Sequence, residues 1–431
     1  MGRRVFLSML GTGFYEKCRY QKDGFLGTET TFVQKNLVEY LQKKESWGRD
    51  DKDKVIMLLT DAAKKNNWNK DITSRFNSKL QDNMPYVGLE KIFVDMGVSY
   101  KAVGIDDGKD EKQMWRLFGV IFNQLEEEDR LYLDITNSFR YLPMLLVVLV
   151  NYAKFLKNVK VEAIYYGNYE ARDTETNIAP IMDLLPLSSL QDWTSAASDY
   201  LQYGQVDKLH SLSKQELEPI LRNPDTRAED PKYLGKFVNA LKKIVDERIT
   251  CRGLDIIKSR NVKFLENNAQ KIREVAIPQL GPVFEKIIES LKDFGTVGDV
   301  YNCLKAAKWC FENKLYQQAI TLLEEGLVTV LCDSYHLDYT QKKDRRLISN
   351  CIHIASQKTP EEKWEVNEED KKTISEILKN EKYLASLTGV LELRNDYNHA
   401  GFNKDHKSAN KVIERIESLI GTIENVLKFT K

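Results

Sequence analysis

The chain has 431 residues, of which 42% are hydrophobic and 30% charged, and its 64 Lys and Arg are balanced by 64 Asp and Glu. This is the composition of a globular protein with room for two or three domains, each with its own core. The zero net charge excludes the global cationic field of a general nucleic-acid binder, so any contact with nucleic acid must be a local patch. The six cysteines form no CxxC pair and there are only five histidines, so we expect no metal site.

The first part of the chain alternates short apolar runs with helix-like stretches. The expected strands are residues 5–10, 55–59, 91–94, 131–135 and 159–166, and the expected helices are residues 31–42, 115–126 and 143–156. Continuous apolar strands separated by helices predict an α/β fold, with a parallel sheet covered on both faces. In such sheets ligands bind at the carboxyl ends of the strands.

The glycine-rich stretch after the first strand is one candidate for ligand binding. The backbone N–H groups of Gly11, Thr12 and Gly13 suit a phosphate or a ribose. The third glycine of a dinucleotide fingerprint is absent, and a tight turn explains the stretch equally well.

A stronger candidate follows the strand at residues 131–135. Thr136, Asn137 and Ser138 supply hydroxyl and amide groups, and Arg140 adds a cation before the next helix. Such a group suits an anion site, while plain helix capping is the alternative. Thr60 closes the second strand in a comparable place, so polar loops at two strand ends indicate a ligand crevice.

Beyond residue 186 the strand signal almost disappears. Helical periodicity marks residues 192–201, 233–245, 269–294, 300–311, 316–331, 371–393 and 409–427. The sequence therefore predicts an α/β domain in residues 1–186 and an all-helical domain in residues 187–431, with an inserted helical or linker segment at about 205–300. The longest apolar run, residues 142–150, is about half a membrane span, so we expect a cytoplasmic protein without a membrane segment.

The helical part carries the other chemical candidate, the stretch from Arg394 to His399. A permanent cation and an imidazole, with the amides of Asn395 and Asn398 between them, can cleave a phosphodiester without a metal. Residues five apart on an ideal helix point about 140° apart, so one copy is an awkward active site. The side chains can converge if the helix ends nearby, which Gly401 favours, or if two copies meet across a symmetry axis. A solvated polar helix end is the alternative.

Together these stretches resemble a known family, the CRISPR-associated CARF–HEPN ribonucleases of type III systems. The matching stretches are residues 11–13, residues 134–140 (DITNSFR), residues 315–324 (LYQQAITLLE) and residues 394–399 (RNDYNH). They run in the family's order over most of the chain, whereas residues 205–300 match nothing.

The resemblance implies a Rossmann-like CARF sensor domain that binds a cyclic oligoadenylate, with cyclic tetra-adenylate favoured, across the two-fold axis of a homodimer or a higher oligomer. Its ligand contacts would come from Gly11, Thr12, Gly13, Thr60, Thr136, Asn137, Ser138 and Arg140. The family often has His-Gly where this chain has Asn137-Ser138, which leaves the ring size and any cleavage of the ligand open.

The resemblance also implies a HEPN domain in which two protomers build one metal-independent endoribonuclease site, acting in antiviral defence without a cofactor. Arg394 would stabilise the phosphorane, His399 would transfer protons, and Asn395 and Asn398 would orient the RNA or the imidazole. The 2′-OH of single-stranded RNA would attack, leaving cyclic phosphate ends. Two other interpretations stay open: a non-catalytic, ligand-responsive regulator that binds nucleic acid, and a nuclease that linearises the cyclic ligand.

Overall fold

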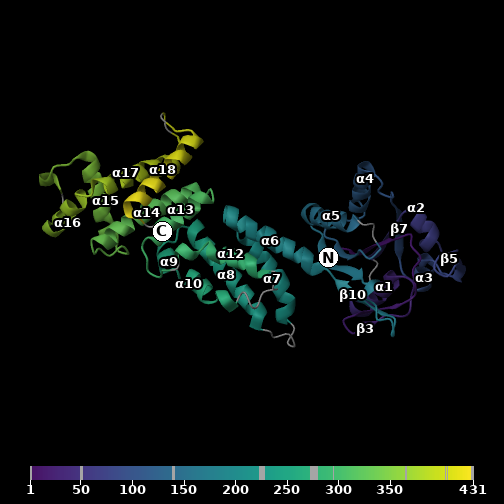
Figure 1. Ribbon diagram of the computed structural model, residues 1–431. Coiled ribbons are helices and arrows are strands. Elements are labelled where there is room, and N and C mark those ends of the chain that lie inside the picture. Colours follow the sequence, from purple (N-terminus) through teal and green to yellow (C-terminus); the bar gives the residue numbers. More distant parts are fainter. Residues whose placement is uncertain are drawn as a thin grey trace. The chain divides into compact units, whose positions relative to one another are not determined.

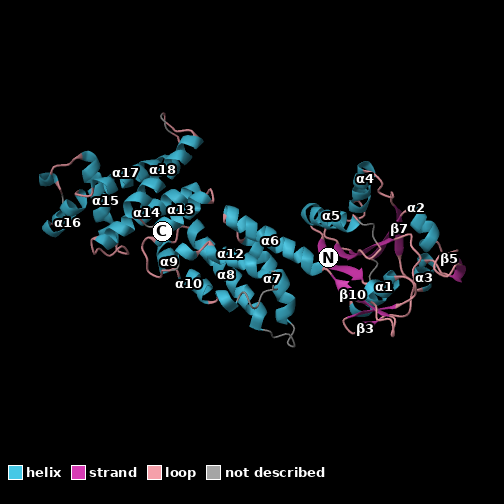
Figure 2. Cartoon of the chain, in the orientation of Figure 1, coloured by secondary structure: helices cyan, strands magenta, loops and turns pink. Residues whose placement is uncertain are grey.

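The computed structural model describes residues 2–48, 52–137, 141–222, 229–271, 280–294, 296–364, 366–402, 404 and 406–428, with the backbone alone in 216–222 and 229–232. The chain divides into two compact units, Met1–Ser189 and Leu190–Lys431 (Figure 1). The sequence placed this boundary after residue 186. In the described residues the first unit is α/β and the second is helical, which confirms the predicted fold class (Figure 2).

An eight-stranded sheet organises the first unit, in the strand order β3-β2-β10-β9-β8-β1-β4-β7. The central strand β1 (Arg4–Leu10) pairs in parallel with β4 (Asp53–Leu59) on one side and β8 (Arg130–Asp134) on the other. The other strands are β7 (Tyr100–Gly104) and β9 (Lys160–Gly167), both in the parallel part, then β10 (Ile178–Asp183), β2 (Arg19–Lys22) and β3 (Phe25–Leu26). β10 runs antiparallel to β9.

Alternate residues of β1 serve two hydrophobic cores. Phe6 and Leu10 share a core with α1 (Val33–Lys44) and α3 (Leu89–Asp95). Val5, Leu7 and Met9 share the other core with α4 (Glu111–Phe122) and α5 (Leu142–Lys157), on the opposite side of the sheet (Figure 2). Successive side chains of a strand point to opposite faces, so a sheet covered on both faces needs nearly continuous apolar strands.

One predicted strand is wrong. Residues 91–94 belong to helix α3, where Leu89 and Phe93 are buried on one helix face, and Gly97, with φ of 66°, follows the end of the helix. The strand of this region is β7, which the sequence did not predict. It lies at the edge of the sheet with mostly exposed side chains, so it lacks a continuous apolar run.

Short elements lie at the rim of the sheet. A separate hairpin is formed by β5 (Ser74–Asn77) and β6 (Asp82–Pro85). The one-turn helix α2 (Asp61–Ala63) continues into the π-helical turn η1 (Lys64–Trp68), and the 3-10 turn η2 (Tyr169–Ala171) follows β9. None of these short elements was predicted from the sequence.

The second unit is built on one hydrophobic core. Its helices are α6 (Leu185–Tyr203), which begins in the first unit, α7 (Asp207–Arg222), α8 (Glu229–Ile249), α9 (Gly253–Lys258), α10 (Arg260–Asn267), α12 (Gly281–Glu289), α13 (Asn302–Glu312), α14 (Tyr316–Ser334), α15 (Lys342–Gln357), α16 (Glu368–Leu378), α17 (Glu381–Asn398) and α18 (Ala409–Leu427). Leu209, Phe237 and Phe284 of the segment 205–300 are buried in this common core, so that segment is an integral part of the unit.

The helix predictions hold with two differences. α18 has the predicted bounds, and Ile416, Leu419 and Ile423 of its apolar stripe are buried. Residues 371–393, predicted as one helix, belong to α16 and α17, because the chain leaves helical geometry at Asn380 (φ −92°, ψ 62°). Of the predicted helix 269–294, residues 272–279 lie outside the described part, and α12 covers residues within the rest.

Candidate functional site

The strand order of the sheet reverses beside β1. The chain passes from β1 to β4 on one side, while β8, the next strand after β7, pairs with the other side of β1. Loops that leave two neighbouring parallel strands in opposite directions open a crevice between them, where α/β proteins bind ligands. Here those loops follow Leu10 and Asp134.

Asp134 is a carboxylate at this point and is only 1% exposed. It accepts hydrogen bonds from Ser8 Oγ (2.7 Å), Gln34 Nε2 (3.1 Å), the backbone N–H of Thr136 (3.0 Å) and Thr136 Oγ1 (2.6 Å). Burial raises the pKa of Asp134, and these four bonds oppose the shift because they stabilise the charged form. Thr136 Oγ1 also accepts from Gly167 N (2.8 Å), so Asp134 ties the ends of β1, β8 and β9 to α1.

A cavity of about 430 Å³ opens beside this cluster. Its aromatic lining residues are Phe14, Tyr15, Tyr20, Tyr166 and Tyr169, and polar side chains, including those of Thr136 and Asn137, lie between them. The volume is toward the lower end of the roughly 300–1,000 Å³ that small-molecule sites occupy. Flat aromatic faces beside hydroxyl and amide groups suit a ligand with flat rings and a polar backbone.

The glycine stretch is fixed through its carbonyl groups. Asn67 Nδ2 donates to Gly11 O (2.8 Å) and Gly13 O (2.9 Å), and Arg75 Nη2 donates to Thr12 O (2.6 Å). A Cβ on Gly11 would lie 2.5 Å from the hydroxyl oxygen of Tyr15, so glycine is required for that close approach. The stretch therefore holds its shape without a ligand.

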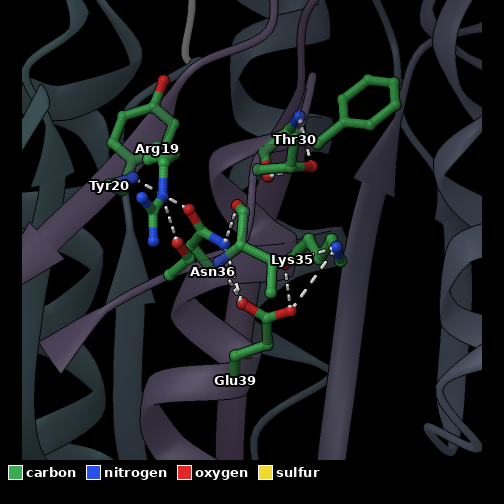
Figure 3. A network of polar contacts seen from close by, with 9 residues as sticks. Arg19, Tyr20, Thr30, Lys35, Asn36 and Glu39 are labelled. Carbon is green, nitrogen blue, oxygen red and sulfur yellow. Dashed lines mark hydrogen bonds and ion pairs between the residues drawn. The ribbon is translucent and has the colours of Figure 1, made fainter. Parts of the chain in front are cut away.

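One wall of the cavity is held by a polar network around Asn36 on α1 (Figure 3). Asn36 Oδ1 accepts from the backbone N–H of Tyr20 (3.0 Å), and its Nδ2 donates to Thr28 O (2.9 Å) and Glu39 Oε2 (2.8 Å). Lys35 Nζ donates to Thr28 Oγ1 (2.6 Å). The network attaches β2, and with it the ring of Tyr20, to the helix.

Some of the predicted ligand residues line the cavity and others do not. Thr136 and Asn137 line the cavity, whereas the cavity lining does not include Gly11, Thr12 or Gly13. Thr60 is 1% exposed, and its Oγ1 accepts from Ala63 N (3.2 Å) as the N-cap of α2. Ser138 and Arg140 lie outside the described residues.

Sequence reasoning missed most of the lining. Tyr166 lies near the carboxyl end of β9 and Tyr169 follows that strand, so the strand-end rule that found Thr136 could have found them. Phe14, Tyr15 and Glu16 directly follow the glycine stretch. Asn77, at the end of β5, and Ser78 and Lys79, in the β5–β6 turn, also line the cavity, and this hairpin was not predicted from the sequence.

The second candidate stretch lies at the end of α17. The helix ends at Asn398 with His399 as its C-cap, and Ala400 (φ 53°) and Gly401 (φ 68°) follow in left-handed conformations. Gly401 N donates to Asp396 O (3.0 Å) and Ala400 N to Tyr397 O (3.0 Å), the bond pair of a Schellman motif. The helix end expected near Gly401 is thus present, and Asn395, Asn398 and His399 are all exposed there.

Arg394 is held by the neighbouring helix α14. Its Nε lies 3.0 Å from Glu324 Oε2, although the two atoms lack the alignment of a hydrogen bond. The side chain of Glu324 is only 9% exposed and that of Arg394 is 34% exposed. Burial raises the pKa of Glu324, and the charge of Arg394 opposes that shift. Glu324 closes the stretch 315–324 that the sequence singled out.

Metal-binding groups and membrane-spanning helices are absent from the described residues. Within the described residues, no three or more His, Cys, Asp or Glu side chains are grouped so as to hold a metal ion. None of the helices in the described part of the chain is both long and apolar enough to span a membrane.

Comparison with known proteins agrees with the crevice at the sheet end. Residues 5–170 match the family described as CRISPR system endoribonuclease Csx1, CARF domain. The matched region contains β1 from Val5 on, the strands β4, β7, β8 and β9, the Asp134 cluster and all the described residues that line the cavity. Over most of its length the first unit is therefore similar to a CARF domain.

A curated relative points to the same class. The chain is 28% identical over 273 residues to the CRISPR-associated protein MJ1674 of Methanocaldococcus jannaschii, a match that covers 62% of this chain. The match spans 39% of that relative's length. This chain is therefore similar to CRISPR-associated proteins, and the likeness to the CARF domain lies in its first unit.

Proposed function

We propose that this protein is a metal-independent endoribonuclease that cleaves single-stranded RNA in type III CRISPR antiviral defence when its CARF domain binds a cyclic oligoadenylate. The observation that carries the proposal is that one chain joins a CARF-like domain to a helical unit that presents Arg394 and His399 at the end of α17. A sensor domain of this kind needs an output, and these two residues are the chemically equipped candidates in the second unit.

The proposed reaction uses the RNA's own 2′-OH as nucleophile. The hydroxyl attacks the adjacent phosphorus, the bond to the 5′-oxygen breaks, and the products carry a 2′,3′-cyclic phosphate and a 5′-hydroxyl. His399 would transfer the protons and Arg394 would stabilise the extra negative charge of the phosphorane. Asn395 and Asn398, exposed beside them, would orient the RNA or the imidazole. Glu324 would hold the guanidinium of Arg394 in place.

The surface of α5 supports the proposal of a homodimer. This helix is apolar on two sides, since Leu145 and Leu149 are buried against the sheet while Met144 is 72%, Val148 57% and Phe155 83% exposed. An apolar face of this kind marks an interaction surface. We infer that a second copy covers it, because two protomers would then bring two cavities and two α17 ends into one particle.

The ligand would be shared by the two protomers. A cavity of about 430 Å³ accommodates only part of a cyclic tetra-adenylate, the ring size we favour, and the second protomer would hold the rest. Such a ligand binds tightly only when both protomers are correctly placed. Binding could thereby be coupled to the arrangement of the two α17 ends, which is allostery in the strict sense of two sites and two states.

The test is an RNA cleavage assay with and without cyclic tetra-adenylate, in EDTA. We expect the wild type to cleave only with the ligand, and Arg394→Ala and His399→Ala to lose about 10²- to 10⁴-fold in rate. His353→Ala is the matched control, because His353 is an exposed histidine on α15 in the same unit. The variants should bind the cyclic ligand as tightly as the wild type.

Other outcomes would favour the other interpretations. RNA binding without cleavage would indicate a regulator, and loss of the cyclic ligand with intact RNA would indicate a nuclease that linearises it. Activity abolished by EDTA would contradict the metal-independent mechanism.

A further inference from the structure

An ion pair lies at the mouth of the cavity, that is, at its solvent-exposed rim, where Ser78 and Lys79 are exposed. Lys79 Nζ, from the β5–β6 turn, lies 2.9 Å from Glu16 Oε1, and both residues line the cavity. On the other side Tyr169 donates from its hydroxyl to Glu16 Oε2 (2.7 Å). Three segments far apart in the sequence therefore meet at one carboxylate.

The backbone of Lys79 is fixed although its side chain is exposed. Asn77 Oδ1 accepts from Lys79 N (2.9 Å) and Leu80 N (3.3 Å), which closes the hairpin turn. Arg75, in the first strand of the hairpin, donates to the carbonyl of Thr12 and packs over the rings of Phe14 and Tyr86. The hairpin is thus anchored to the glycine stretch, and its turn holds Lys79 at the cavity.

This ion pair contributes little to stability. The side chain of Lys79 is 79% exposed and that of Glu16 is 36% exposed, and pairs this solvated contribute about 0–1 kcal/mol. The two hydrogen-bonding partners, Lys79 first and Tyr169 second, lower the pKa of Glu16, so the carboxylate is charged at neutral pH. A weak pair can be exchanged, and its place across a cavity mouth points to a role in binding.

The charges of the lining favour one role for the lysine. Lys79 is the only Lys or Arg among the described residues that line the cavity, and the same lining holds two carboxylates, Glu16 and Glu170. A ligand with phosphate groups is repelled by those carboxylates and attracted by Lys79, the one cation of the described lining. The guanidinium of Arg172, which lies 4.0 Å from Glu16 Oε2, is outside that lining. A lysine on a flexible stem is suited to such a contact.

We propose that Lys79 binds a phosphate group of the ligand, and that Glu16 holds the lysine across the mouth until that phosphate replaces the carboxylate. Lys79 then contacts the phosphate, while Glu16 keeps its bond from Tyr169 and gains capacity to accept from a ligand amine or hydroxyl. The inference rests on the proposed function for the identity of the ligand, a cyclic oligoadenylate, and adds the residue that recognises its charge.

Calorimetric titration of the full-length protein with cyclic tetra-adenylate tests the exchange. We expect Lys79→Ala to weaken binding about tenfold and to reduce its dependence on salt. Glu16→Gln removes the competing carboxylate and should bind up to about fivefold more tightly than the wild type. Lys65→Ala is the matched control, because it removes the same charge from an exposed position of η1 away from the cavity. All three variants should unfold at the wild-type temperature, since none removes a buried contact.

The possible results separate this inference from the proposed function. If the wild type binds no cyclic oligoadenylate, the proposed ligand is wrong and the inference falls with it. If the wild type binds and Lys79→Ala binds equally well, the role of Lys79 alone is refuted. A loss in Glu16→Gln as large as in Lys79→Ala would show that Glu16 contacts the ligand directly, and would overturn the exchange.

Discussion

The two candidate sites of this chain are built in opposite ways. At the sheet end, Asp134, Asn67 and Asn36 each bind several backbone or side-chain groups, so the crevice is shaped by buried or half-buried hydrogen bonds. At the end of α17, His399 is exposed, and of the proposed catalytic side chains Arg394 is the one with an assigned ionic contact. The first site is preorganised by contacts within its own unit. In the proposed function, RNA or a second protomer would fix the positions of the groups of the second site.

Removing the Asp134 side chain should have the largest effect on stability, because Asp134 is the centre of the hydrogen bonds that shape the sheet-end site. Asp134→Ala leaves the hydrogen-bond donors of Ser8, Gln34 and Thr136 without their acceptor, and we expect a loss of about 3 kcal/mol in the free energy of unfolding. Thermal unfolding would measure it, with the exposed Asp71→Ala as control, which should change stability by less than about 0.5 kcal/mol. If Asp134→Ala were stable and still bound ligand, the sheet-end site would not be preorganised by Asp134.

Replacing Gly11 by Ala should have the next effect. The new Cβ would lie 2.5 Å from the Tyr15 hydroxyl oxygen, so Tyr15 must move out of its place in the cavity wall, at a cost of about 2 kcal/mol. Ligand affinity, measured by titration, should fall with stability. Gly13→Ala is the matched control, since its Cβ would have its nearest neighbour at 3.9 Å and should be tolerated. Equal behaviour of the two variants would show that the glycine stretch is adaptable.

Much of the fold could be predicted because the central strands are buried on both faces. The runs at β1, β4, β8 and β9 are apolar almost without interruption, which only a covered parallel sheet explains. The edge strand β7 has no such run, and the helical spacing of Leu89 and Phe93 was overlooked in a segment as short as α3.

The candidate sites were predictable only where one local rule applies. Thr136 and Asn137 were found because strand ends converge at a sheet edge. Lys79 contacts Glu16, which is 63 residues away in the sequence, and Glu324 on α14 contacts Arg394 on α17. Such contacts depend on tertiary packing and leave no local pattern in the sequence.

Arg394→Ala should have a smaller and pH-dependent effect on stability. It leaves the carboxylate of Glu324 almost buried without its cation, which we expect to cost about 1–2 kcal/mol at pH 7, less than for a fully buried pair because Arg394 is partly exposed. Since burial already raises the pKa of Glu324 above 4.5, the folded chain keeps this proton to higher pH than the unfolded chain does. The free energy of unfolding therefore falls as pH rises from about 4.5 through the raised pKa of Glu324. The loss of stability in Arg394→Ala should accordingly be smaller near pH 4.5 than at pH 7.

Urea unfolding at the two pH values would measure this dependence. The double variant Arg394→Ala/Glu324→Gln is the control, because the neutral amide removes the uncompensated charge and should restore most of the loss at pH 7. An equal loss of stability at both pH values would mean that the ion pair with Glu324 does not position Arg394. Within the described residues, neither Arg394 nor His399 would then have a contact that holds its side chain in place.

The smallest expected effect comes from changing the backbone at the end of α17 without changing the proposed catalytic residues. Ala400 has φ of 53°, a left-handed conformation that costs an alanine about 1 kcal/mol, so Ala400→Gly should stabilise the protein by about 0.5–1 kcal/mol. Gly401→Ala is the opposite change at φ of 68°, where the nearest atom to a new Cβ is 3.7 Å away, and should destabilise by a similar amount without a clash. The backbone bonds from Ala400 to Tyr397 and from Gly401 to Asp396 remain available in both variants. We therefore expect RNA cleavage to stay within about twofold of the wild type while stability moves in opposite directions. A tenfold fall in cleavage in the stabilised Ala400→Gly variant would instead show that the restricted backbone of Ala400 fixes the position of His399. The end of α17 would then be as preorganised as the crevice.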